Sequence, residues 1–222
     1  MSQPPISLHA RALLLDMDGT LVDSGAVVLR VWGRWAAEHG LDMERVEEVV
    51  HGRQGQESMA ILLPDRPVAE NLADNERMLA AETADLDGVV PIPGAPVFLT
   101  AIAAAPHALV TSADVALATA RMGAAGLRMP DVRVTAEDVS ASKPDPEGFL
   151  KGAAELGFEP GDCVVFEDSE AGVAAGLAAG MRVVGVGAAT AGYGATVTVD
   201  DLTQVAVEPG PDGGIVLRIS RR

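Results

Sequence analysis

The 222-residue sequence predicts an α/β protein with a parallel β-sheet core and an inserted all-helical domain. Residues 97–186 alternate between strand and helix patterns, which is typical of parallel strands joined by right-handed crossovers. Residues 42–87 contain helical patterns only, and such a block between two strand-like regions indicates an insertion. The apolar run at residues 12–15 lacks polar alternation, as expected for a central strand covered on both faces.

The first half of the chain sets the domain boundaries. After the strand at residues 12–15, Ser24 caps a predicted helix that runs to His39 and ends at Gly40. The insertion continues with three helical patterns, at residues 43–50, 57–63 and 67–86. The proline-rich segment 91–96 is a stiff connector at its far end. We therefore expect a core domain at residues 1–22 and 92–222, and a helical cap domain at residues 23–91.

The second half completes the predicted sheet. Strand patterns lie at residues 107–111, 132–135, 163–166 and 182–186. Helical patterns alternate with them, at residues 97–105, 113–125, 146–156 and 169–179. Apolar runs at residues 205–207 and 215–219 flank a glycine- and proline-rich turn, which predicts a β-hairpin.

Composition excludes several classes of partner. Sixteen basic and 32 acidic residues give a net charge of −16, which argues against a nucleic acid or an anionic membrane as a partner. An anionic substrate would therefore need local positive groups.

The single cysteine and the absence of a targeting pattern bear on localisation. Cys163, the only cysteine, excludes an internal disulfide and fits a reducing cytoplasm. It lies in an apolar run that predicts burial. Residues 1–11 lack the pattern of a signal peptide, and residues 171–192 are too interrupted to span a bilayer. We expect a cytoplasmic protein.

Two carboxylates at the end of the first strand indicate a metal site. Asp16 and Asp18 follow the apolar run directly, and Gly19 comes next. Open α/β sheets bind ligands at the carboxyl ends of their strands. Two carboxylates this close repel each other unless a cation neutralises them. The alternative is a solvated Asp-Gly turn.

The ends of three later strands carry polar residues as well. Thr111 and Ser112 could hold a phosphate at a helix N-terminus, or simply cap that helix. Lys143 precedes Pro144 on a rigid loop, where a fixed ammonium would stabilise carboxylates and a phosphoryl group; an isolated surface lysine is the alternative. Glu167 and Asp168 add carboxylates, which in a very acidic protein can also be surface groups. With Asp16 and the Asp18 main-chain carbonyl they would form the all-oxygen site that magnesium prefers.

The order of these motifs resembles the haloacid dehalogenase superfamily, specifically its phosphatases with a helical cap after the first strand. The four matching segments are residues 16–24, 110–112, 142–146 and 166–172, and the match extends over residues 11–187. The resemblance implies a Rossmann-like core. Within the superfamily the chain is most similar to sugar-phosphate and glycerol-phosphate phosphatases, on the basis of residues 35–41 and 51–54.

The resemblance implies a magnesium-dependent phosphomonoester hydrolase that acts on a small phosphorylated metabolite, a sugar or polyol phosphate. Asp16 would be the nucleophile that forms an aspartyl-phosphate, and Asp18 the general acid and then the general base. Mg²⁺ would be held by Asp16, Asp18, Glu167 and Asp168. The phosphoryl oxygens would be bound by Thr111, Ser112 and Lys143, with Gly19 letting backbone donors approach.

The cap is expected to close over this site about two hinges, at residues 22–25 and 90–94. Its candidate specificity loop is residues 51–57, in which His51, Arg53 and Gln54 could contact the phosphate or sugar hydroxyls. The alternative is a solvated loop. Some relatives place an arginine where Gln54 stands here, so the sequence leaves the role of Arg53 open. A mobile cap is compatible with a monomer.

Two other functions compete with hydrolysis. A phosphosugar mutase of the β-phosphoglucomutase type is the first, but such enzymes carry a histidine shortly after the first motif, and residues 24–27 contain none. Thr20, where those enzymes have valine, also favours hydrolysis. A catalytically idle binding or regulatory module is the second, and the intact reacting positions argue against it. A dehalogenase would not need Asp18.

Overall fold

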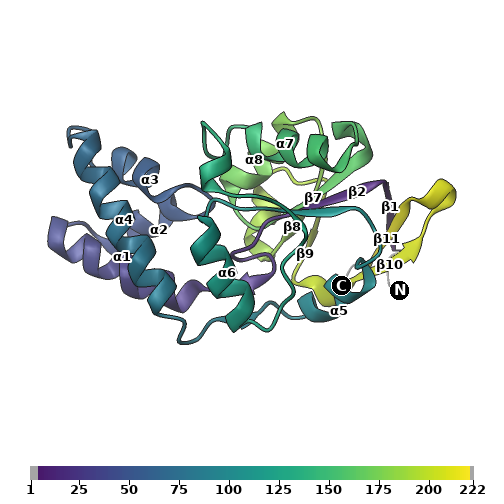
Figure 1. Ribbon diagram of the computed structural model, residues 1–222, viewed down its shortest axis with the longest axis horizontal. Coiled ribbons are helices and arrows are strands. Elements are labelled where there is room, and N and C mark those ends of the chain that lie inside the picture. Colours follow the sequence, from purple (N-terminus) through teal and green to yellow (C-terminus); the bar gives the residue numbers. More distant parts are fainter. Residues whose placement is uncertain (1–4, 221–222) are drawn as a thin grey trace.

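The computed structural model describes residues 5–220, with the Asp212 side chain left aside. Residues 1–4, part of the segment inspected for a signal peptide, lie outside the described range. A helical cap stands to one side of an α/β core, and a small sheet that contains the first and the last strand lies on the far side (Figure 1). Within the described part of the chain, no helix has the length and apolar character needed to cross a membrane.

The core is built on a six-stranded sheet in the order β6-β5-β2-β7-β8-β9 with all pairs parallel, which confirms the predicted parallel sheet. Its strands are β2 Ala12–Leu15, β5 His107–Val110, β6 Val132–Val134, β7 Cys163–Glu167, β8 Arg182–Val186 and β9 Val197–Val199. The strand β2 is buried along its whole length between β5 and β7. Only β9, three residues long, was not predicted from the sequence.

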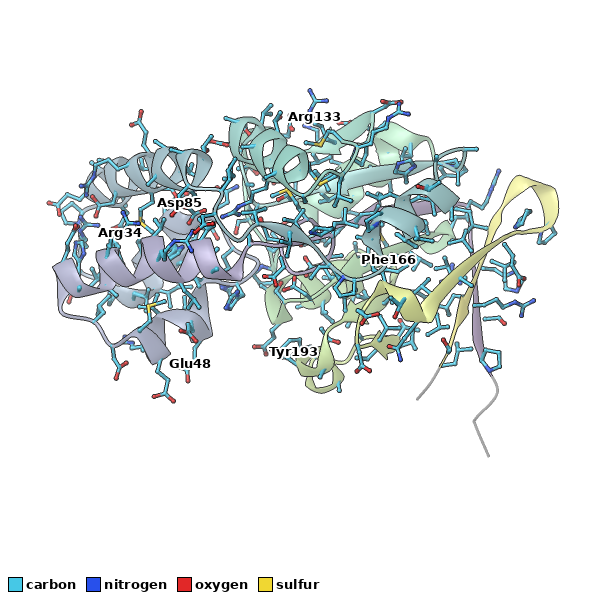
Figure 2. All side chains as sticks on the ribbon, turned by 90° about the horizontal axis from the view of Figure 1, so that it is seen from below. Arg34, Glu48, Asp85, Arg133, Phe166 and Tyr193 are labelled. Atoms are coloured by element: carbon cyan, nitrogen blue, oxygen red, sulfur yellow. The ribbon has the colours of Figure 1, made fainter. Side chains whose placement is uncertain are left out.

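Helices cover both faces of this sheet: α5 Ala95–Ala101 and α6 Val115–Ala124 on one, α7 Glu147–Leu156 and α8 Glu170–Ala178 on the other (Figure 1). Because side chains alternate along a strand, Leu13 and Leu15 join the apolar cluster on the first face and Leu14 joins the cluster on the second. Phe166 of β7 packs at a tilt on Phe98 of α5, with ring centroids 4.9 Å apart, inside the core (Figure 2).

The cap consists of four helices, α1 Gly25–His39, α2 Met43–Val50, α3 Gly55–Leu62 and α4 Val68–Ala84. Asp74 of α4 is buried within the cap. It accepts hydrogen bonds from Trp35 Nε1 at 2.9 Å, from Arg66 at 2.6 Å and from Arg77. The chain enters the cap through β3 Val22–Asp23 and leaves it through β4 Val90–Pro91. These two segments pair with each other in antiparallel fashion.

The predicted hairpin is confirmed as β10 Val205–Pro209 and β11 Ile215–Ile219. A further strand, β1 Ile6–Ala10, pairs with the other edge of β11 and completes a three-stranded antiparallel sheet. The lone cysteine, Cys163, lies fully buried at the start of β7, and burial raises its pKa to about 11. The prediction that Cys163 is buried is therefore confirmed.

Candidate active site

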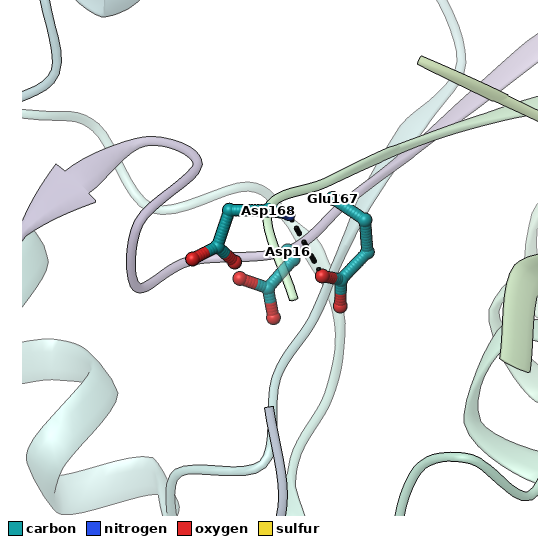
Figure 3. A group of neighbouring side chains, drawn as sticks. All are labelled: Asp16, Glu167 and Asp168. Atoms are coloured by element: carbon teal, nitrogen blue, oxygen red, sulfur yellow. Dashed lines mark hydrogen bonds between the residues drawn. The ribbon is translucent and has the colours of Figure 1, made fainter. Parts of the chain in front are cut away.

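Three carboxylates meet at the carboxyl end of the sheet. Asp16 follows β2, Glu167 ends β7 and Asp168 comes next, so two adjacent strands deliver them to one point (Figure 3). One oxygen of each carboxylate lies within 4.8 Å of the other two. Buried oxygens this close are the donor set of a hard divalent cation such as Mg²⁺, so the residues fit the predicted metal.

Lys143 supplies the only ammonium that touches this group within residues 5–220. Its Nζ donates to Asp16 Oδ1 at 2.5 Å, to Glu167 Oε1 at 2.6 Å and to the Val110 carbonyl at 3.2 Å. Burial raises the pKa of Asp16 to about 8; the Lys143 charge opposes this rise and the Glu167 charge adds to it. Burial lowers the pKa of Lys143, but the two carboxylates outweigh it and the net shift is upward. One ammonium thus leaves the three carboxylates undercompensated.

Glu167 is oriented by the protein itself. Its Oε2 accepts hydrogen bonds from the backbone N–H groups of Asp168 and Ser169 and from Ser169 Oγ, at 2.9 to 3.0 Å, and its Oε1 accepts from Lys143. Gly172 leaves room for this carboxylate, because a Cβ there would lie 1.8 Å from Oε1. Glu167 therefore holds Lys143 and the 168–169 loop in place. Burial and the charges of Glu167 and Asp16 raise the pKa of Asp168 well above its usual range.

Gly19 makes room for the Asp168 carboxylate. It adopts a φ of +81°, and a Cβ at this position would lie 1.9 Å from Asp168 Oδ2. Its N–H donates to the Val22 carbonyl at 2.8 Å, inside a tight turn. The close approach of Asp168 is thus one reason for glycine at this position, and the expectation that Gly19 lets backbone donors reach a phosphate stays a prediction.

Thr111 and Ser112 line a cavity that lies between cap and core, above the carboxylates. Their hydroxyls already have hydrogen-bond partners. Thr111 Oγ1 accepts from the backbone N–H of Ala113 at 3.1 Å, in the turn before α6. The side chain of Asp114 caps that helix, so the capping alternative for Thr111 and Ser112 is wrong. Ser112 Oγ donates to the Gly52 carbonyl of the cap loop at 2.9 Å. In this conformation Ser112 joins the cap to the core.

The cap loop, residues 51–57, rests on the core. Arg53 donates to the Lys143 carbonyl at 3.4 Å, and Gln54 donates from Nε2 to the Ala136 carbonyl at 3.3 Å. The Gln54 N–H donates to Ser142 Oγ at 3.2 Å. His51 and Arg53 line the cavity between cap and core. Gln54 lines a smaller neighbouring cavity together with Ser112 and Lys143, and its contact with a substrate stays a prediction.

Asp18 has partners that sequence reasoning missed. Ser24 Oγ donates to Asp18 Oδ1 at 2.7 Å, so Ser24 begins α1 without the predicted side-chain cap. Arg121 of α6 donates to Asp18 Oδ2 at 2.8 Å and to Glu82 Oε2, on α4 of the cap, at 2.7 Å. A single arginine in the otherwise uncharged helix 115–124 was the only sequence signal for this bridge.

A cavity of about 200 Å³ lies between cap and core, directly above Asp16, Asp18 and Asp168. The side chains of Val28, Trp32, Val50, Met78 and Leu117 form its apolar part, and those of His51, Arg53, Asn75, Glu82 and Arg121 form its polar part. Asp16, Asp18 and Asp168 therefore face a small cavity with both apolar and polar walls.

Comparison with known proteins places this site in a family. A family model described as haloacid dehalogenase-like hydrolase matches residues 10–180. The chain belongs to this family. Hexitol phosphatase A of Escherichia coli is 38% identical over 216 residues, 95% of this chain and 100% of that protein. Glycerol-1-phosphate phosphohydrolase 2 of Saccharomyces cerevisiae is 32% identical over 84% of this chain and 78% of its own length.

A solved structure of β-phosphoglucomutase from Clostridium difficile superposes with a TM-score of 0.78, covering 88% of this chain and 92% of that one. Its sequence identity of 24% shows a shared fold. Among haloacid dehalogenase-like hydrolases, this chain is a phosphatase enzyme, since the relatives that match it over most of their length are phosphatases.

Proposed function

We propose that this haloacid dehalogenase-like phosphatase is a Mg²⁺-dependent hydrolase of a small phosphorylated sugar or polyol. The observation that carries the proposal is the burial of Lys143 between Asp16 and Glu167, with Asp16 and Asp168 lining the small cavity beside them. Relatives with phosphatase names, matched at 38% and 32% identity, support the same reaction.

In the proposed mechanism Asp16 attacks phosphorus and its carboxylate oxygen forms a new P–O bond. The bond to the ester oxygen breaks, its electron pair stays on that oxygen, and Asp18 donates the proton that makes the alcohol. Asp18, now a carboxylate, takes a proton from water, which attacks the aspartyl-phosphate and releases inorganic phosphate. Lys143, Thr111 and Ser112 are proposed to bind the other phosphoryl oxygens.

The metal is proposed to bind Asp16, Asp168 and the Asp18 main-chain carbonyl. Glu167, which already accepts four hydrogen bonds, is proposed to act chiefly through Lys143 and the 168–169 loop. A bound Mg²⁺ would offset the negative charge of the carboxylates and of the phosphoryl group. Lys143 keeps the Asp16 carboxylate oriented in that environment.

The mixed lining of the cavity favours a substrate with both carbon surface and hydroxyl groups. A volume of about 200 Å³ suits a small sugar or polyol and excludes a polymer. We further propose that residues 23–91 move against residues 1–22 and 92–222 to admit it, and that the enzyme works as a cytoplasmic monomer. The mutase alternative rests on fold likeness at 24% identity, and residues 24–27 lack the expected histidine.

Phosphate release from a panel of sugar phosphates, polyol phosphates and nucleotides, with Mg²⁺ or with a chelator, tests the proposal. We expect Mg²⁺-dependent release, fastest with a sugar or polyol ester. Asp16→Asn should release none, whereas Asp85→Asn, which breaks an ion pair on the cap, should match the parent. Release by Asp16→Asn at the parent rate would overturn the mechanism, and isomerised sugar phosphate without free phosphate would favour a mutase.

A further inference from the structure

Arg121 joins the cap to the group that handles the proton. Its side chain is 3% exposed, and its two terminal nitrogens point to carboxylates from different parts of the molecule. One binds Asp18 Oδ2 at 2.8 Å, in the turn after β2, and the other binds Glu82 Oε2 at 2.7 Å, near the end of α4. A guanidinium thus bridges core and cap beside the catalytic cavity.

This bridge determines how the Asp18 side chain is oriented. Ser24 Oγ donates to Asp18 Oδ1 at 2.7 Å, so both oxygens have a fixed donor. The planar fork of arginine can hold two acceptors at once, which a lysine cannot do with the same geometry. The Glu82 carboxylate also offsets the positive charge that Arg121 brings next to Asp18.

The bridge depends on the position of the cap. Glu82 is 7% exposed, and burial with the nearby Asp18 charge raises its pKa despite the opposing effect of Arg121. If α4 moves away from α6, Glu82 leaves with it and the arginine keeps a single carboxylate partner. The Arg121 guanidinium is then held by one carboxylate in place of two, so its position is less fixed.

We propose that Arg121 and Glu82 are positioning residues that align Asp18 for proton donation only when the cap lies on the core. The inference rests on the proposed phosphatase function, since it concerns the acid of that reaction. Arg121 stays a protonated guanidinium and Glu82 stays a carboxylate throughout. The proton moves from the Asp18 carboxyl to the ester oxygen as the P–O bond breaks, and neither positioning residue touches phosphorus.

The dependence of kcat/KM on the leaving group tests this role. Substituted phenyl phosphates have similar size but leave with different ease, and only the poor leaving groups need a proton donor. kcat/KM reports the first chemical step alone, so the later attack of water does not enter. For the parent we expect a shallow dependence on the acidity of the phenol, because Asp18 supplies the proton.

Arg121→Met keeps the length of the side chain and removes both hydrogen bonds. We expect kcat/KM to fall about 100-fold for the least acidic phenol and less than about threefold for dinitrophenyl phosphate. Retained activity on dinitrophenyl phosphate also shows that the variant is folded. Glu82→Ala should steepen the dependence in the same direction by a smaller factor, and Glu82→Gln should restore it, because an amide oxygen still accepts from Arg121.

Two variants frame the measurement. Asp18→Asn sets the steepest dependence attainable. Asp85→Asn breaks a 2.7 Å ion pair with Arg30 elsewhere on the cap and should leave the dependence at the parental value. An equal fall for every phenol in Arg121→Met, or an unchanged slope with a raised KM for sugar phosphates only, would overturn the positioning role. If the parent releases no phosphate from any ester, the phosphatase proposal fails, and this inference fails with it.

Discussion

The core and the cap contribute different kinds of groups to the site. The core half consists of charged side chains, with Asp16, Lys143 and Glu167 locked together at 2.5 to 2.6 Å. The hydrogen bonds between the cap loop and the core each pair a side chain with a main-chain group, such as Ser112 with the Gly52 carbonyl and Ser142 with the Gln54 N–H. Reaction chemistry therefore depends on which residues are present, whereas closure of the cap depends more on the path of the backbone.

Two glycines show both halves pressing on one loop. Gly19 has a φ of +81° and lies where a Cβ would be 1.9 Å from Asp168 Oδ2. Gly52 has a φ of +78° and lies where a Cβ would be 2.1 Å from Ser169 Oγ. Core and cap thus approach neighbouring residues of the same loop. Gly19 of the core lies against the Asp168 carboxylate, and Gly52 of the cap lies against Ser169, the N-cap of α8.

The largest effect should come from the core half. Lys143→Met leaves Asp16 and Glu167 buried without their cation, which should cost about 3–5 kcal/mol of unfolding free energy in metal-free protein. The loss of its charge at the phosphoryl group should lower kcat/KM about 1,000-fold. Denaturant unfolding with and without Mg²⁺, and phosphate release, measure the two effects. Activity within tenfold of the parent would contradict the assigned role of Lys143.

The matched pair Gly19→Ala and Gly52→Ala separates the two halves most directly. Gly19→Ala should displace Asp168 and raise the Mg²⁺ concentration for half-maximal activity about 10–100-fold, as expected when the support of a metal ligand is lost. Gly52→Ala should leave that concentration unchanged and lower the rate of sugar-phosphate hydrolysis, because the added Cβ keeps the cap loop from approaching Ser169. Magnesium titrations of both variants decide the matter, and equal shifts would mean that the two contacts are not independent.

The stability of the cap should depend on Asp74. Burial would raise its pKa, but hydrogen bonds from Arg77, Trp35 and Arg66 outweigh it and lower the pKa from 3.8 to about 2. A carboxyl with a lowered folded-state pKa stabilises the fold above its unfolded pKa and loses that contribution as the pH falls toward its folded pKa. Asp74→Asn should therefore destabilise the protein by about 2 kcal/mol at pH 7 and by about half as much at pH 3.

Urea unfolding of Asp74→Asn at the two pH values measures this difference, with Asp85→Asn as control. Asp85, which is labelled in Figure 2, forms an ion pair with Arg30 of the cap. Its replacement should change stability little at either pH, because exposed pairs are screened by water. A deficit in Asp74→Asn that stays constant from pH 7 to pH 3 would show that the carboxylate charge is not what stabilises the cap.

The smallest effect is expected for Ser112→Ala. The variant loses one hydrogen bond to the Gly52 carbonyl, which is worth about 0.5–1.5 kcal/mol and should reduce kcat/KM for a sugar phosphate a few-fold. Inhibition by inorganic phosphate should keep its parental constant if the hydroxyl serves the cap. A tenfold weaker inhibition would instead assign the hydroxyl to the phosphoryl group.

Sequence reasoning located the central sheet and the strand-end residues, because parallel strands bring distant motifs to one edge whatever lies between them. The strands β1 and β9 escaped it for a physical reason: β9 is three residues long, and β1 is held by β11, some 200 residues away. Arg121 was missed because its role exists only in the meeting of α6 with the turn after β2 and with α4. The hydrogen bond of Gln54 to the Ala136 carbonyl could not be predicted either, because no sequence pattern shows which way a loop side chain points.

The short ribbon formed by β3 and β4 bears on how such enzymes diversify. Val22 faces Pro91 and Asp23 faces Val90, so the chain leaves and re-enters the core at neighbouring points. Everything between these points can be exchanged for a segment of another length without changing the register of any strand in the six-stranded sheet. The ribbon is thus an insertion point, at which a different cap domain could replace this one while the core half of the site stays unchanged.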